Sequence, residues 1–112
     1  MKKNSILKPR FCLALTTVST NLEARKFARA LVQEKLAACV SLIPIKASFY
    51  FWKNRAQSGK EILLLIKTRQ RLIPRLKKWI LARHSYELPE FLTLSVEDGH
   101  QPYLRWILEN TR

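Results

Sequence analysis

The most hydrophobic stretch of the chain, Ile62 to Ile66, is apolar at every position instead of at alternate positions. A strand with this pattern is buried on both faces, and five residues are too few for a core helix. Gly59 precedes the run, whereas the charged residues Lys67 and Arg69 close it. The pattern predicts a central strand that is flanked by other strands and covered by helices or by a second subunit.

The segments ahead of this strand predict another strand and a helix. Residues 11–18 combine aromatic, aliphatic and Thr side chains without Gly or Pro, which favours a strand. Thr20 and Glu23 have the spacing of a capping box, in which each side chain bonds the backbone N–H of the other residue. Apolar residues then recur at helical spacing, so we expect a helix to about Ala37 on one face of the sheet.

The alternation of apolar residues changes phase within residues 39–52. Val40 and Leu42 are apolar at even positions, the apolar residues of 45–51 occupy odd positions, and Pro44 lies between them. A change of phase by one residue indicates a β-bulge. We therefore expect a long, bent strand over this segment.

This long strand is predicted to turn through residues 53–58 and to return as the central strand from Lys60. It is longer than a small sheet can pair along its full length. Its aromatic end, Phe49 to Trp52, should project from the subunit. A projecting apolar surface of this kind usually marks an interface.

The last third of the chain predicts a helix, a loop, a strand and a helical tail. Residues 70–83 have an apolar helical face, with Pro74 tolerable only in the first turn. Pro89 keeps the following loop out of helix, residues 91–96 form the fourth strand, and a short helix ends the chain. The order is that of a split βαβ arrangement, an α+β fold with helices on one face of an antiparallel sheet. The other face is left uncovered, and assembly is the simplest way to cover it.

Composition and charge narrow the class of protein. The 112 residues form a single domain, with residues 1–9 expected to be frayed. Twenty-one Lys and Arg against eight Asp and Glu give a net charge of +13, which attracts nucleic acid, anionic lipid or acidic proteins without choosing among them. No stretch is long and apolar enough for membrane insertion or for the usual signal peptide.

The cysteines and the lack of catalytic motifs give no indication of an enzyme. Cys12 and Cys39 lie in apolar runs, which is typical of reduced, buried thiols in a cytosolic protein. The sequence has no recognisable nucleophile and base pair and no Gly-rich phosphate loop. We therefore expect neither a catalytic reaction nor an organic cofactor.

Several motifs together resemble the CutA divalent-cation tolerance family. In order along the chain they are EKLAACV at 34–40, the aromatic run that ends at Trp52, EILLLIKT at 61–68, HSYELPE at 84–90 and YLRW at 103–106. The resemblance implies a ferredoxin-like fold, a homotrimer in which long hairpins bridge subunits, a cytoplasmic location and a role in tolerance of copper and other divalent ions. It implies no catalytic reaction.

The resemblance also indicates where a metal could bind. In some relatives copper is assigned to a Cys in the first strand and to a His-His pair. The matching positions here are Thr16, Arg83 and His84. Only His84 keeps a metal-binding side chain, so we expect weak binding of copper or another divalent ion that depends on this imidazole. Cys12 is a possible replacement ligand.

The loop allows two interpretations. His84, Glu87 and Glu90 could supply metal ligands together, or Glu90 could pair with a cation such as Lys67 while His84 faces solvent. Charged and aromatic residues at positions matching the family motifs could line a ligand cleft between subunits or form an ion-pair network that fixes the trimer: Trp52, Glu61, Lys67, Tyr86 and Glu90.

Two functions of different class follow. One is a metal-binding or metal-responsive trimer, and the other is a basic scaffold that binds nucleic acid or another polyanion. The second rests on the net charge and on the uniformly basic outer face of residues 70–83. Salt should weaken polyanion binding steeply, whereas pH and chelators should control metal coordination.

Overall fold

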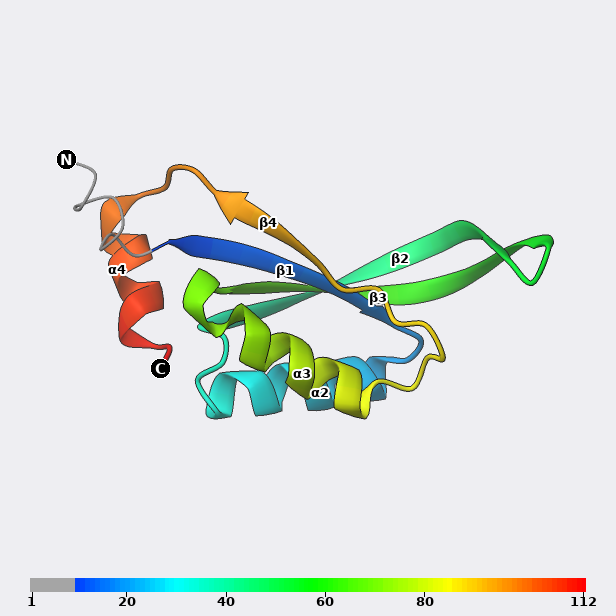
Figure 1. Ribbon diagram of the computed structural model, residues 1–112, viewed down its shortest axis with the longest axis horizontal. Coiled ribbons are helices and arrows are strands. Elements are labelled where there is room, and N and C mark those ends of the chain that lie inside the picture. The colour runs from blue at the N-terminus through cyan, green and yellow to red at the C-terminus, as the bar shows by residue number, and fades with distance from the viewer. Residues whose placement is uncertain (1–9) are drawn as a thin grey trace.

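The computed structural model describes residues 10–112, and the expected fraying of residues 1–9 lies outside this range (Figure 1). The strands are β1 (Phe11–Val18), β2 (Cys39–Trp52), β3 (Arg55–Arg69) and β4 (Leu92–Val96). The helices are α2 (Asn21–Gln33), α3 (Ile73–Arg83) and α4 (Gln101–Glu109), with a 3-10 turn at Gln70–Leu72 ahead of α3. The predicted order of elements is confirmed.

The four strands form one antiparallel sheet in the order β2-β3-β1-β4. Helices α2 and α3 lie side by side on the same face of this sheet (Figure 1). The strand that contains the Ile62 to Ile66 run is therefore central, as its apolar pattern predicts. The arrangement confirms the α+β, ferredoxin-like fold.

Helix α2 begins as predicted but ends early. The Thr20 hydroxyl accepts a hydrogen bond from the Glu23 backbone N–H at 3.1 Å, which satisfies one of the free donors of the first turn. The helix ends at Gln33 because Lys35 adopts a φ of 59° and the Leu36 N–H turns back to the Leu31 carbonyl. The expected end at Ala37 is wrong, since the apolar residues beyond Gln33 pack from a capping turn.

The β2–β3 hairpin contains the predicted bulge and a tighter turn than expected. The pairing shifts between Ile45 and Ser48, so the phase change occurs just after Pro44. Lys53 and Asn54 have φ values of 53° and 64°, as in a two-residue type I′ turn. The predicted turn over residues 53–58 is therefore wrong, because β3 already begins at Arg55 and pairs with the end of β2.

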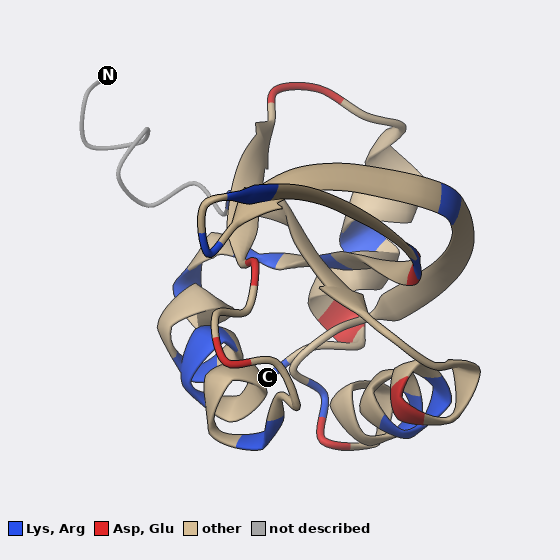
Figure 2. Ribbon diagram, turned by 90° about the vertical axis from the view of Figure 1, so that its right-hand side faces the viewer, with Lys and Arg blue, Asp and Glu red and all other residues tan. Residues whose placement is uncertain are grey.

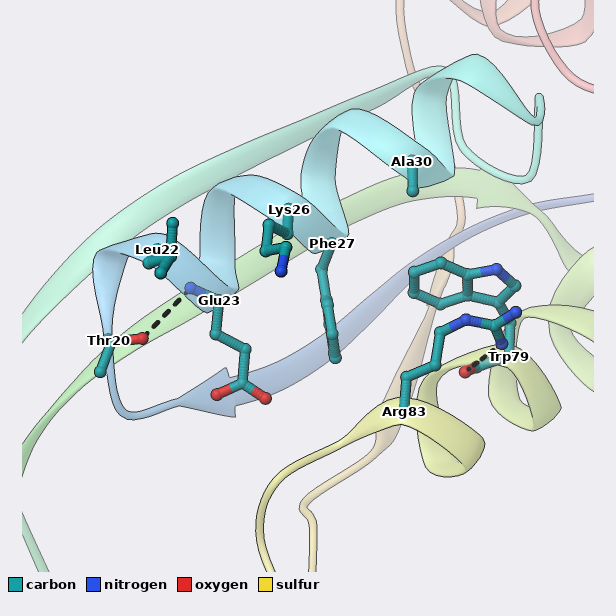
Figure 3. Close-up of a pocket in the computed structure, with 8 residues that line it drawn as sticks. All are labelled: Thr20, Leu22, Glu23, Lys26, Phe27, Ala30, Trp79 and Arg83. Carbon is teal, nitrogen blue, oxygen red and sulfur yellow. Dashed lines mark hydrogen bonds between the residues drawn. The ribbon is translucent and has the colours of Figure 1, made fainter.

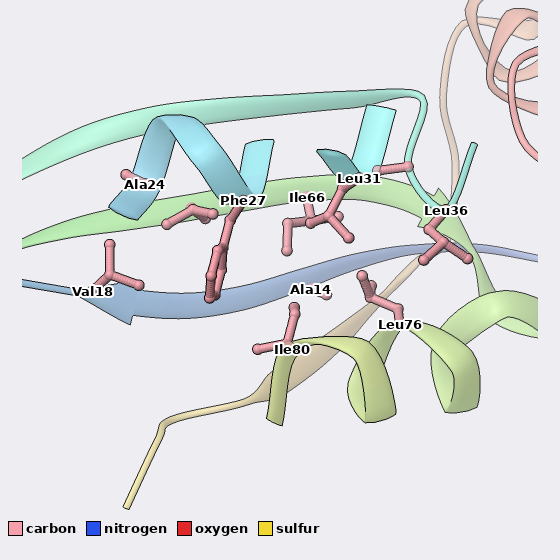
Figure 4. Close-up of a cluster of buried hydrophobic side chains, with 11 residues drawn as sticks. Ala14, Val18, Ala24, Phe27, Leu31, Leu36, Ile66, Leu76 and Ile80 are labelled. Atoms are coloured by element: carbon pink, nitrogen blue, oxygen red, sulfur yellow. The ribbon is translucent and has the colours of Figure 1, made fainter. Parts of the chain in front are cut away.

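The hydrophobic core lies between the sheet and the two helices (Figure 4). Leu31 of α2, Leu76 and Ile80 of α3, and Leu64 and Ile66 of β3 are completely buried there. Successive residues of a strand point to opposite faces of its sheet. The even-numbered residues at the centre of β3 therefore face the helices, and the odd-numbered ones face the opposite side.

The opposite face of the sheet carries apolar side chains that α2 and α3 do not cover. Leu15 is paired with Leu65 on one side and with Leu92 on the other, and all three are at least partly exposed. Leu94 beside them is 53% exposed. We call this surface the open sheet face; it confirms the predicted uncovered side.

The hairpin carries a second apolar surface away from the core. Phe49 is 82% exposed and Phe51 is 71% exposed on the part of the β2–β3 hairpin that extends beyond β1 and β4 (Figure 1). The predicted projection of the aromatic end is confirmed. Among residues 10–112, no helix is long and apolar enough to cross a membrane.

Candidate functional site

The loop between α3 and β4, residues 84–91, is fastened to three other elements. The Ser85 backbone N–H and hydroxyl donate to the two carboxylate oxygens of Glu23 on α2, at 3.1 and 2.8 Å. The hydroxyl of the fully buried Thr16 on β1 donates to the Glu90 carbonyl at 2.7 Å. These contacts fix a segment that has no regular secondary structure and place its side chains at the end of the sheet.

The Glu23 side chain therefore bonds the loop instead of completing the capping box with Thr20. Its carboxylate was expected to bond the backbone N–H of Thr20, whereas it accepts from Ser85, 62 positions further along the chain. Thr16 has a similar role, since its hydroxyl holds the loop from a position where the family resemblance suggested a metal ligand. Sequence patterns give no signal for either contact, because each joins distant segments through one or two hydrogen bonds.

Tyr86 and Glu61 form the clearest polar pair of the predicted cluster. The Tyr86 hydroxyl donates to a Glu61 carboxylate oxygen at 2.7 Å, which connects the loop to β3. Burial, the hydrogen bond to Glu61 and the negative charge of that carboxylate raise the pKa of Tyr86 well above its usual range. The phenol therefore remains a donor at neutral and moderately alkaline pH.

Replacing Tyr86 by Phe should lower the free energy of unfolding by about 1 kcal/mol at neutral pH, because a half-exposed hydrogen bond to a carboxylate is lost. The folded-state pKa of Tyr86 is raised, so its stabilising effect is complete below the unfolded-state value of about 10 and fades above it. The difference between variant and parent, measured by urea unfolding, should shrink as pH rises above about 10. A difference that grows with pH would contradict this assignment.

Lys67 does not pair with Glu90. The Lys67 ammonium group donates to the Ser41 hydroxyl at 3.3 Å and to the Cys39 sulfur at 3.5 Å, across the neighbouring strand β2. Lys67 lies six residues beyond Glu61 on β3, which corresponds to about 20 Å along the strand. In a single subunit Lys67 thus bonds side chains of β2 and not Glu90.

Trp52 lies in the opposite direction along the hairpin, where it pairs with Arg55, six residues before Glu61. Within one subunit the structure thus joins Glu61 and Tyr86, brings the Glu90 backbone close to β1, and leaves Lys67 and Trp52 elsewhere along the hairpin. The five residues do not form one cluster in a single chain.

Both ring nitrogens of His84 have partners. The Nε2 atom lies 2.9 Å from the Thr17 carbonyl oxygen, to which it donates, and Nδ1 accepts from the Tyr86 backbone N–H at 3.1 Å. This pattern belongs to a neutral imidazole whose free lone pair is already used. A metal ion could bind His84 only in place of one of these hydrogen bonds. Because both nitrogens are bonded within the subunit, His84 does not simply face solvent.

The residues of one subunit do not fit a tight metal centre. Across residues 10–112, no group of three or more His, Cys, Asp or Glu side chains is placed to hold an ion. Cys12 is buried inside the subunit, and burial raises the pKa of its thiol, which disfavours the thiolate that metals prefer. Cys12 is therefore a poor replacement for the missing ligand.

The fold and motif order can now be compared with those of known proteins. A family model described as CutA1 divalent ion tolerance protein matches residues 12–110, nearly the whole chain. This chain belongs to the CutA1 divalent ion tolerance family. The sequence resemblance is thus confirmed at the level of the family.

CutA1 relatives occur in bacteria and animals. The divalent-cation tolerance protein CutA of Thermus thermophilus is 41% identical over 99 residues, 88% of this chain and 96% of that protein. The CutA homologue of Danio rerio is 41% identical over 97 residues, 87% of this chain. This chain spans only 65% of the length of the Danio rerio protein and 55% of the length of human CutA.

Solved CutA1 structures share the fold. The Thermus thermophilus structure superposes with a TM-score of 0.87 at 40% identity, covering 91% of this chain and 99% of that one. The Oryza sativa CutA1 structure gives 0.89 at 35% identity, covering 92% and 94%. The long hairpin and the open sheet face are therefore part of an architecture that this chain shares with the solved CutA1 structures.

Proposed function

We propose that this chain acts as a divalent-cation tolerance protein in the form of a homotrimer. The observation that supports the assembly is the pair of unlike apolar surfaces, the open sheet face and the projecting hairpin. A contact between two different surfaces is heterologous, and such contacts close into rings when the rotation permits. Three subunits make the smallest ring of this kind, in agreement with the trimer that the resemblance implies.

The assembly would also complete the cluster predicted from the sequence. Trp52 lies beside the hairpin turn, so in this proposal it meets Tyr86 and Glu61 of a neighbouring subunit. The cluster then serves as an intersubunit ligand cleft or as a network that fixes the ring.

The mass of the protein in solution tests this assembly. Light scattering coupled to gel filtration should give about 40 kDa, three copies of the 13.2 kDa chain, at micromolar concentration. A monodisperse particle with the mass of one chain would reject the trimer and the intersubunit cluster with it. A dimer would also reject the ring, because two copies meet through a self-complementary contact instead of a heterologous one.

We propose a weak metal contact at His84 in each subunit. Its weakness follows from the hydrogen bonds to Thr17 and Tyr86, one of which has to be given up. Threefold symmetry could add further ligands from neighbouring subunits. Protonated imidazole cannot coordinate a metal, so binding should weaken in acid.

The His84→Ala variant should lose most of its copper binding in a calorimetric titration at about pH 7.5, and the parent should lose most of its own at about pH 5.5. His100→Ala is the matched control, because His100 is the other histidine of the chain and is exposed. Equal affinity of the His84 variant and the parent would exclude His84 as a ligand. The trimer mass of each variant shows whether the loop has stayed in place.

The proposed compartment is the cytoplasm. Cys12 and Cys39 are both free thiols, as expected in a reducing compartment. Relatives occupy other compartments, since an Arabidopsis thaliana relative is named chloroplastic and an Archaeoglobus fulgidus structure is described as periplasmic. Fractionation of the source cells would decide the location of this chain.

A further inference from the structure

A groove between α2 and α3 is not used by the proposed assembly. It has a volume of about 480 Å³ and lies between the first half of α2 and the end of α3 (Figure 3). We call it the interhelical groove; the residues that matter here are Leu22, Lys26, Phe27, Ala30, Trp79 and Arg83. It lies on the helical side of the molecule, opposite the open sheet face.

The floor of the interhelical groove is apolar and preformed. The Phe27 ring stands edge-on to the Trp79 ring, with centroids 5.3 Å apart and an interplanar angle of 80°. Leu22, at the mouth, is 70% exposed, so a large aliphatic side chain borders the groove without a partner of its own. Such a floor suits an apolar side chain from another molecule.

The rim of the interhelical groove is positively charged. Lys26 comes from α2 and Arg83 from α3, and further exposed cations follow along both helices (Figure 2). On α3 these are Arg75, Lys77 and Lys78, whereas Arg25 and Arg29 of α2 border a different hollow, between α2 and β2. Glu23 is the one acidic residue that lines the groove, and its carboxylate is bound to Ser85. The rim therefore favours a negatively charged ligand.

We propose that the interhelical groove docks an acidic, amphipathic segment of a partner protein. One apolar side chain of the segment enters between α2 and α3, above Phe27 and Trp79 and bordered by Leu22 at the mouth, and carboxylates beside it meet Lys26 and Arg83. This is recognition of a peptide by a groove between helices, with charge complementarity at the rim. The partner surface is distinct from the assembly surfaces, so one subunit can use both.

The same observations disfavour other occupants. Single-stranded nucleic acid binds through bases stacked on open aromatic faces. The Arg83 guanidinium already stacks on the Trp79 ring, 4.3 Å from its centroid, so a base could stack there only by displacing it. A second copy of this chain carries a net charge of +13 and would bring like charges to the rim.

The probes for this surface are two labelled helical peptides of about twelve residues, rich in Glu and Ala. One carries a single Phe at its centre, and the other carries Ser at that position. Fluorescence anisotropy at about 0.15 M salt measures binding while screening long-range attraction. The Phe peptide should bind at least about tenfold more tightly than the Ser peptide, a difference of about 1.4 kcal/mol.

The variants separate the groove from general charge. Lys26→Glu should weaken the Phe peptide at least about tenfold, and Leu22→Ser should reduce its advantage over the Ser peptide. Arg29→Glu is the matched control, because it makes the same charge change on α2 but borders a different hollow, between α2 and β2. It should change binding less than about threefold. All three positions are outside the core, so light scattering should give the parent mass for each variant.

Three outcomes would overturn the proposal. Equal losses for Lys26→Glu and Arg29→Glu, with no preference for the Phe peptide, would show attraction to charge alone. Tighter binding of a labelled oligothymidine than of the Phe peptide, sensitive to the same variants, would assign the surface to nucleic acid. Failure of both peptides to bind would also reject the docking site, while the proposed trimer and its mass would stand unaffected.

Discussion

Replacing Leu94 by Asp is expected to convert the proposed trimer into single, folded chains. Leu94 is 53% exposed in one subunit and lies on the open sheet face, so the variant can fold with its carboxylate in water. In the assembly the same carboxylate would be buried without a partner, at a cost of about 3–5 kcal/mol for each subunit. Light scattering should show the mass fall to that of one chain.

Leu81→Asp is the control for this prediction. The substitution introduces the same charge, but Leu81 is 42% exposed on α3, on the helical side of the molecule and away from both proposed assembly surfaces. The control should keep the parent mass. An unchanged mass for the Leu94 variant would show that subunits do not meet through the open sheet face, whatever their number.

Truncating Leu64 to Ala should have the largest effect on the stability of the subunit itself. Its side chain is completely buried among the residues that join the sheet to α2 and α3. Removing a buried leucine side chain typically lowers the free energy of unfolding by about 2–5 kcal/mol, because apolar contacts are lost and a cavity remains. Urea unfolding should show this loss at every protein concentration.

Leu65→Ala is the matched comparison, one residue further along β3 and on the other face. Leu65 is only partly buried in a single subunit. Its truncation should act mainly on assembly, so the unfolding midpoint should fall most at low protein concentration. Equal, concentration-independent losses for both variants would mean that the two faces of β3 are equally covered within one chain.

The hydrophobic pattern predicted the central features of the fold. The run Ile62 to Ile66 identified the central strand because burial on both faces leaves no polar position. The phase change around Pro44 identified the bulge, since side chains alternate strictly along a strand. Patterns of this kind are local, and the residues that carry them are close together in sequence.

The turn and the end of α2 were harder to predict. Residues 55–60 have no apolar alternation, yet they are in a strand because they pair with β2 after the Lys53-Asn54 turn. The end of α2 depends on the left-handed conformation of Lys35. Gly or Asn usually occupies this conformation at a helix end, so a lysine gives no sequence signal for it. In both places backbone geometry decided the structure against the pattern of side chains.

The candidate site was predictable as a set of residues but not as a geometry. The family motifs pointed to Glu61 and Tyr86, which do form a hydrogen bond. Nothing in the sequence indicated that His84 would use both ring nitrogens within the subunit, since its partner Thr17 lies 67 positions away. Such contacts follow from the packing of the loop on β1, which appears only in three dimensions.

The pairing of β1 has a consequence for the order of folding. Its residues pair with β3, about 45 to 60 positions later, and with β4, about 80 positions later, so closing these loops costs the unfolded chain much entropy. The β2–β3 hairpin pairs locally through a two-residue turn and can close first. A growing chain therefore presents Phe49 and Phe51 before any sheet or neighbour covers them. Lys53 in the turn and Arg55 beside it place positive charge next to this exposed strand and oppose its aggregation.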